Sequence, residues 1–84
     1  MNWIYFYQNF RSVKLFFKVL IDGTKVLVKV NPIHLKGTEI TIFEDGNSEL
    51  RELDFDEAIF EDLKEDGFEI ASPLEFNLYL SGLA

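Results

Sequence analysis

Residues 13–30, which read VKLFFKVLIDGTKVLVKV, decide the fold of this chain. The stretches 13–20 and 25–30 are rich in β-branched and aromatic residues, and both alternate in the manner of strands. Between them lies Asp22-Gly23, a pair that two-residue type I′ turns favour because both central residues need positive φ. The sequence therefore predicts a β-hairpin closed at Asp22-Gly23.

The length of this loop sets the register of the hairpin, and the register decides which side chains share a face. A two-residue loop places Ile21 opposite Thr24 and Val19 opposite Val26. One face is then wholly apolar and is formed by Val13, Leu15, Phe17, Val19, Val26, Val28 and Val30. The other face, called the lysine face below, carries Lys14, Phe16, Lys18, Leu20, Lys25, Leu27 and Lys29.

Three further strands are predicted after the hairpin. Asn31-Pro32 ends the second strand, because proline lacks the N–H that a sheet ladder needs. Residues 38–44 (TEITIFE) alternate as a third strand, and a cluster of turn-forming residues then leads into a fourth at 49–53. A short strand is expected at 68–71 (FEIA).

A helix is predicted over residues 55–66. Asp54 is expected to be its N-cap, with Glu57 three residues later as in a capping box. Apolar residues recur within it at helical spacing, and Gly67 stands where a left-handed C-cap belongs. This pattern predicts a helix that packs one apolar stripe on the sheet.

Residues 73–81 fit two structures. Their apolar residues alternate with polar ones as in a half-buried strand, whereas Ser72-Pro73-Leu74-Glu75 is a capping box with proline at the first helical position. Gly82 is a plausible helix stop, and we favour a short helix here.

The composition is that of one globular unit, and we expect residues 1–84 to form a single domain. Hydrophobic residues make up 48% of the chain and charged residues 27%, which is ordinary for a folded protein. The predicted fold class is α+β: a small antiparallel sheet of four to six strands, with one or two helices packed on one face.

The N-terminal run Trp3-Ile4-Tyr5-Phe6-Tyr7 has high β-propensity and no charge. We expect it to form a further strand or an oligomer or partner surface, since aromatic residues are enriched at interface cores. It has no basic flank and is too short to span a membrane. We therefore expect no membrane association, and a cytoplasmic location follows by default.

The net charge of −7 is divided unevenly along the chain, with +5 in residues 1–38 and −12 in residues 39–84. Either the two halves face one another and partly neutralise, or the molecule has one basic and one acidic partner surface. The predicted helix 55–66 is the most acidic segment and carries Glu57, Glu61 and Glu65 at helical spacing.

The sequence contains no recognisable catalytic or metal site, and we expect no cofactor. Without cysteine it has no thiol nucleophile, and its one histidine, His34, lies in a predicted loop without a nucleophile elbow. Asp45-Gly46-Asn47 offers oxygen donors but lacks the spacing of an EF-hand loop. No glycine-rich phosphate-binding loop is present.

These observations favour a small non-enzymatic interaction module that binds a protein partner or associates with itself. The lysine face also resembles a platform for single-stranded nucleic acid, but the net charge argues against nucleic-acid binding. Two alternatives stay open: an acidic nucleic-acid mimic that blocks a basic partner, and a small enzyme with a carboxylate site. The residues predicted to form the interaction surface are Trp3, Tyr5, Tyr7, Lys14, Phe16, Lys18, Lys25, Leu27, Lys29, Glu57, Glu61 and Glu65.

Overall fold

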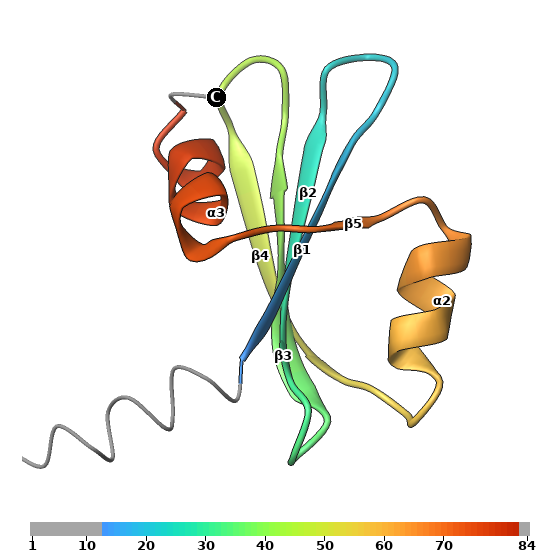
Figure 1. Ribbon diagram of the computed structural model, residues 1–84. Helices are drawn as coiled ribbons and strands as arrows, with labels where there is room; N and C mark the ends of the chain where they lie inside the picture. The colour runs from blue at the N-terminus through green and yellow to red at the C-terminus, as the bar shows by residue number, and fades with distance from the viewer. Residues whose placement is uncertain (1–12, 83–84) are drawn as a thin grey trace, which may run out of the picture.

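The structure is a computed structural model, and it describes residues 13–82. Within this range the chain forms one antiparallel sheet of five strands in the order β4-β3-β2-β1-β5, with helix α2 between β4 and β5 and helix α3 after β5 (Figure 1). The predictions for Trp3–Tyr7 lie outside the described residues. The elements are β1 (Lys14–Val19), β2 (Lys25–Asn31), β3 (Lys36–Ile42), β4 (Ser48–Asp54), α2 (Ile59–Glu65), β5 (Glu69–Ile70) and α3 (Pro73–Leu80).

The predicted α+β class is confirmed, but the two helices lie on opposite faces of the sheet instead of together on one (Figure 1). The reason lies in the central strand β2, where the neighbouring residues Leu27 and Val28 point to opposite faces and are both buried. A sheet that is apolar on both faces must be covered on both. Helix α2 covers the Val28 face, and α3 covers the Leu27 face.

The hairpin is confirmed, but its predicted register is wrong by one residue. Phe16 pairs with Val28, and Phe17 pairs with Leu27. The loop has three residues, Ile21-Asp22-Gly23, and the Gly23 N–H donates to the Leu20 carbonyl at 3.0 Å. Gly23 has a φ of 90°, as a three-residue hairpin loop with glycine at its left-handed position requires.

A shift of one residue exchanges the two faces of β2 relative to those of β1. The predicted lysine face is therefore not formed. Lys14 and Lys18 lie on the α2 face, whereas Lys25 and Lys29 lie on the α3 face. Two separate cores result. The α2 core contains Phe16, Val28, Val30 and Leu63, with Val26, Phe55, Ile59, Phe60 and Phe68 packed against it. The α3 core contains Leu27, Ala71 and Phe76, with Leu15, Phe17, Ile40, Ile42 and Tyr79 around it.

Helix α2 is confirmed but begins later than predicted, and the N-cap assigned to Asp54 is wrong. Asp54 is the last residue of β4, and the next residue, Phe55, donates its N–H to the Leu35 carbonyl at 2.7 Å. This long-range hydrogen bond fixes Phe55 outside the helix. Asp56 then accepts the Ala58 N–H at 2.9 Å, in the turn that leads into Ile59.

The predicted C-terminal end of α2 at Gly67 and the predicted capping box at the start of α3 are both confirmed. Gly67 has a φ of 87°, and the Phe68 N–H donates to the Leu63 carbonyl at 2.9 Å, as in a Schellman motif. The α3 capping box is complete, because the Ser72 hydroxyl accepts the Glu75 N–H and the Glu75 carboxylate accepts the Ser72 N–H, both at 3.1 Å.

The third and fourth predicted strands are confirmed as β3 and β4, which pair from Lys36 with Asp54 to Ile42 with Ser48. Arg51 on β4 lies 3.5 Å from the carboxylate of its cross-strand partner Glu39. Among the helices of residues 13–82, none is long and apolar enough to cross a membrane.

Candidate functional site

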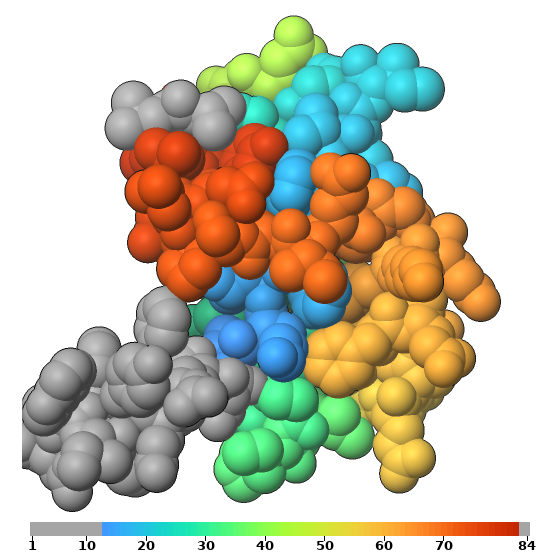
Figure 2. Space-filling model, in the orientation of Figure 1, coloured from blue at the N-terminus to red at the C-terminus, as the bar shows by residue number. Residues whose placement is uncertain are grey.

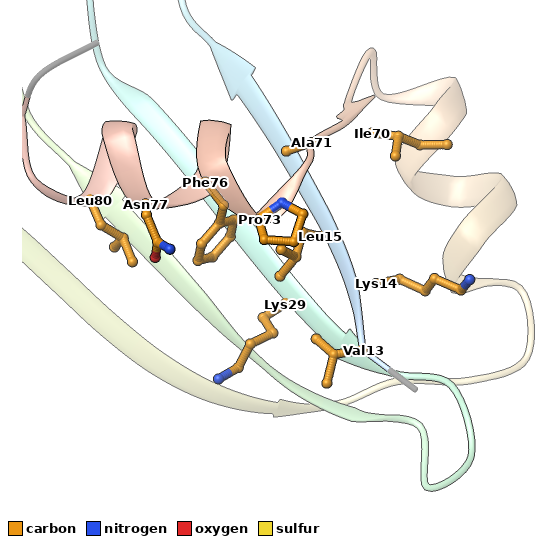
Figure 3. Close-up of a pocket in the computed structure, with 10 residues that line it drawn as sticks. All are labelled: Val13, Lys14, Leu15, Lys29, Ile70, Ala71, Pro73, Phe76, Asn77 and Leu80. Carbon is orange, nitrogen blue, oxygen red and sulfur yellow. The ribbon is translucent and has the colours of Figure 1, made fainter. Parts of the chain in front are cut away.

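An apolar groove runs between helix α3 and the start of strand β1, and we call it the α3 groove. It has a volume of about 380 Å³, which lies within the range of small ligand-binding sites. Leu15 and Phe76 approach each other across it, as Figure 3 shows. Its lining residues are Val13, Lys14, Leu15, Lys29, Ile70, Ala71, Pro73, Phe76, Asn77 and Leu80.

The groove exists because α3 is anchored to the sheet at one end. The Ala71 N–H donates to the Leu15 carbonyl at 2.9 Å, which ties the chain before α3 to β1. The capping box at Ser72 then starts the helix at once, so that Phe76 reaches the sheet and is buried. Towards Leu80, which is 43% exposed, the lining becomes open to solvent.

The edge of the sheet beside the groove is only partly covered. Strand β5 has two residues, and it pairs with Phe16 and Phe17 but not with the first residues of β1. In the space-filling view the start of β1, in blue, is visible beneath α3 and β5 (Figure 2). At this edge Ile70 is 79% exposed, a high value for a large aliphatic side chain that lines a groove.

A second apolar groove lies on the other face of the sheet, against α2, and we call it the α2 groove. Its volume is about 510 Å³. It shares Lys14 and Ile70 with the α3 groove, so the exposed Ile70 stands between the two. The residues that line the α2 groove are Lys14, Phe16, Pro32, Phe60, Lys64, Phe68 and Ile70.

The charged residues that line the two grooves are all basic. Lys14 and Lys29 line the α3 groove, and Lys14 and Lys64 line the α2 groove. Lys14 and Lys29 leave the sheet on opposite faces, as the register requires and Figure 3 shows. A chain of net charge −7 therefore has lysines beside its open apolar surface, while its acidic side chains lie elsewhere.

The structure separates the hairpin residues that were predicted to form one surface. Phe16 and Leu27 are buried in different cores and are not available to stack on a ligand. The Lys18 ammonium donates to the Asp66 carbonyl at the end of α2 and lies 5.7 Å from the Phe68 ring centroid. Lys18 thus stabilises the C-terminus of a helix, where a cation is favourable.

The other predicted surface residues have different positions. The Lys25 ammonium lies 5.7 Å from the Tyr79 ring centroid, and this ring stacks on Phe17 with a centroid distance of 4.9 Å. The residues Glu57, Glu61 and Glu65 are exposed in α2 and the turn before it, and their role as an acidic partner surface stays a prediction. Trp3, Tyr5 and Tyr7 lie outside the described residues.

The sequence reasoning missed most residues of the α3 groove. Lys14 and Lys29 were selected, but Ile70, Phe76 and Leu80 were not. The signal for Phe76 was the capping box at Ser72, which marks the helix whose buried residue is Phe76. Local sequence gave no sign of the exposure of Ile70, which results from the shortness of β5.

The polar groups considered for chemistry lie in turns between the strands. Asp45 accepts the Asn47 N–H at 2.9 Å in its turn, and among residues 13–82 no three acidic or histidine side chains are grouped to hold a metal ion. His34 is exposed in the loop after β2. The backbone N–H of Thr24, 2.9 Å from the Asp22 carboxylate, lowers the pKa of that carboxyl by stabilising its charged form.

Comparison of the chain with protein-family models, with curated proteins and with solved structures found no match. The interpretation of the groove therefore rests on its own geometry.

Proposed function

We propose that this protein is a non-enzymatic interaction module that binds an apolar segment of a partner protein in the α3 groove. The observation that carries the proposal is the groove itself, apolar at its centre and open beside the exposed Ile70. Exposed apolar surface of this kind is typical of protein-binding sites and is unfavourable when left in water.

The charges at the groove define the chemistry of the partner. Lys29 lines the groove from the face of the sheet that α3 covers, whereas the Lys14 side chain leaves β1 on the opposite face, and no acidic residue is among the lining residues. A partner segment with one or two large apolar side chains, followed by aspartate or glutamate, would place a carboxylate beside Lys29. Such charge complementarity selects the partner and its orientation more than it adds affinity.

The test uses nuclear magnetic resonance of the ¹⁵N-labelled full chain with two synthetic peptides of identical apolar core. One peptide is flanked by aspartates and the other by lysines. The aspartate-flanked peptide is expected to shift the amide signals of Leu15, Ala71 and Leu80 and to bind at least about tenfold more tightly, a difference of roughly 1.4 kcal/mol.

A pair of variants provides the control. Ile70→Glu places a charge at the groove and should weaken binding of the aspartate-flanked peptide about tenfold, the effect of losing one apolar anchor. Leu50→Glu makes the same change at a leucine of β4 that is 63% exposed and does not line the groove, and it should leave binding unchanged. Equal binding of both peptides, or shifts away from the groove, would contradict the proposal.

A further inference from the structure

We infer that strand β4 is an interface for a second copy of this chain, which adds its own β4 antiparallel to the first and so continues the sheet across a two-fold axis. This surface is separate from the α3 groove, and the inference does not depend on the proposed function. Strand β4 ends the sheet, and within residues 13–82 no strand pairs with its outer edge. All of its residues except Leu53 are exposed.

The two edges of the sheet differ in how far they can accept another strand. Strand β5 has two residues, whereas β4 has seven that pair with β3 without interruption. Native edge strands are commonly protected by shortness, by proline or by a bulge. Strand β4 has none of these features, and a long regular edge of this kind is a template for one more strand.

The hydrogen bonds at both ends of β4 show which backbone groups point outward. The Phe43 N–H donates to the Asn47 carbonyl at 2.8 Å, and the Phe55 N–H donates to the Leu35 carbonyl at 2.7 Å. Hydrogen-bonded pairs alternate with non-hydrogen-bonded pairs along an antiparallel ladder, and the register between these two bonds is unbroken. The odd-numbered residues of β4 therefore bond to β3. The backbone groups that point to the open edge are those of Ser48, Leu50, Glu52 and Asp54.

The charges of β4 select one register for the second copy. Residues opposite each other in a sheet share a face, so the two-fold axis must pass through a residue of β4. An axis at Leu50 pairs the two leucines by backbone hydrogen bonds and places Glu49 of each copy opposite Arg51 of the other. An axis at Glu49, Arg51 or Glu52 would instead place that residue opposite its own copy, and like charges directly opposite are destabilising.

The side chains around this axis are suited to the pairing on both faces of the sheet. Leu50 lies on the α3 face and is 63% exposed, so contact with the second Leu50 removes apolar surface from water. Arg51 lies on the α2 face, 3.5 Å from Glu39, with its side chain 63% exposed. Glu49 of the second copy therefore adds a second carboxylate beside this guanidinium.

The symmetry of the pairing determines where the two α3 grooves lie. A two-fold axis perpendicular to the sheet leaves each face on its own side, so both α3 helices cover the same face of the continued sheet. The two grooves then open on one side of the dimer. A partner with two apolar segments would be held at both, which raises its apparent affinity without any new contact. This consequence rests on the proposed function, whereas the dimer itself does not.

Sedimentation equilibrium of the full chain tests the dimer. One strand pair makes a small interface, so we expect the mass to rise from monomer to dimer between about 10 μM and 1 mM. Glu49→Arg and Arg51→Glu each place like charges opposite one another at two positions, and each should weaken association at least about tenfold. Glu61→Arg makes the same charge change as Glu49→Arg on the exposed surface of α2, and it should leave association unchanged.

Mixing the Glu49→Arg and Arg51→Glu variants separates the predicted register from a general loss of folding. In the mixed dimer every opposed pair of residues 49 and 51 again carries opposite charges, so association should return to the level of the parent chain. Both variants keep a net negative charge, so their overall charges do not attract each other. A mixture that associates no better than either variant would overturn the inference, as would a parent chain that stays monomeric at about 1 mM.

Two further measurements use the parent chain and a variant described above. Hydrogen exchange of the Leu50 and Glu52 amides should slow as protein concentration rises, whereas that of Arg51 should not change. Leu50→Glu places two carboxylates at the axis and should be monomeric, yet it should bind the aspartate-flanked peptide because each groove is formed by one copy. A dimer that does not bind the peptide supports the β4 interface and contradicts the proposed function. A parent chain that binds the peptide but never dimerises does the reverse.

Discussion

Gly37 on β3 is the position where the smallest change should have the largest effect on stability. A Cβ atom there would overlap the Lys29 carbonyl of the neighbouring strand β2 and would lie 2.8 Å from the Phe55 ring. The ring can turn aside, but the carbonyl belongs to the central strand of the sheet. Gly37→Ala must therefore push β3 away from β2.

The expected cost follows from these two contacts. Overpacking a filled site costs roughly 1–3 kcal/mol, and weakening one ladder hydrogen bond costs about 1 kcal/mol more. Replacing glycine with alanine offsets roughly 0.4–1 kcal/mol of this cost, because it lowers the conformational entropy of the unfolded chain. The net loss should be about 2–3 kcal/mol, a large part of the stability of a small domain. At a urea m-value of about 1 kcal/mol per M, the unfolding midpoint falls by about 2 M or more.

Urea denaturation followed by circular dichroism measures this loss, and a second substitution tests its cause. Combining Gly37→Ala with Phe55→Leu should recover about 0.5–1 kcal/mol, since only the ring contact is relieved. Gly46→Ala introduces a Cβ into open space at a φ of 91° and should show no coupling to Phe55. A midpoint for Gly37→Ala within about 0.5 M of the parent would refute the close approach of β3 to β2.

Four further predictions concern individual hydrogen bonds. Ser72→Ala should destabilise the fold by about 1 kcal/mol in urea denaturation through loss of the α3 capping box. Lys18→Met keeps most of the side-chain stem but loses the bond to the last turn of α2, and the same assay should show a loss of about 0.5–1 kcal/mol. Asp56→Ala should cost about 0.5–1 kcal/mol, whereas Asp54→Ala should be neutral, and equal effects would mean that the start of α2 is misplaced. The Asp22 carboxyl should titrate below the ordinary aspartate range by NMR, so its contribution to stability is present above the ordinary pKa and disappears as pH falls through the lowered pKa.

Local signals in the sequence predicted the elements well where the deciding contacts are local. The capping box at Ser72 and the glycine at 67 mark helix ends through hydrogen bonds between residues three to five positions apart. The start of α2 could not be predicted in this way. The Phe55 N–H donates to the carbonyl of Leu35, which is distant in the sequence, and this hydrogen bond keeps Phe55 out of the helix. No local sequence pattern indicates such a long-range hydrogen bond.

The hairpin was predicted correctly, but an error of one residue in its loop length made the predicted surface wrong. Asp22-Gly23 fits a two-residue turn and also the end of a three-residue loop, because glycine has positive φ in both. The two options differ by one step in register and so exchange the faces of β2. The candidate site was missed for a related reason, since it depends on which face of the sheet α3 covers.

The position of β2 between two cores has a consequence for how the molecule opens. Leu27 and Val28 are adjacent in the chain, yet each belongs to a different core, so detachment of one helix uncovers one face and leaves the other packed. Exchange of amide hydrogens should therefore proceed through two independent local openings, each of low free energy, with the β2 amides protected until both have occurred. A ligand that enters beside α3 can thus be admitted by a fluctuation of that helix alone, without loss of the packing around α2.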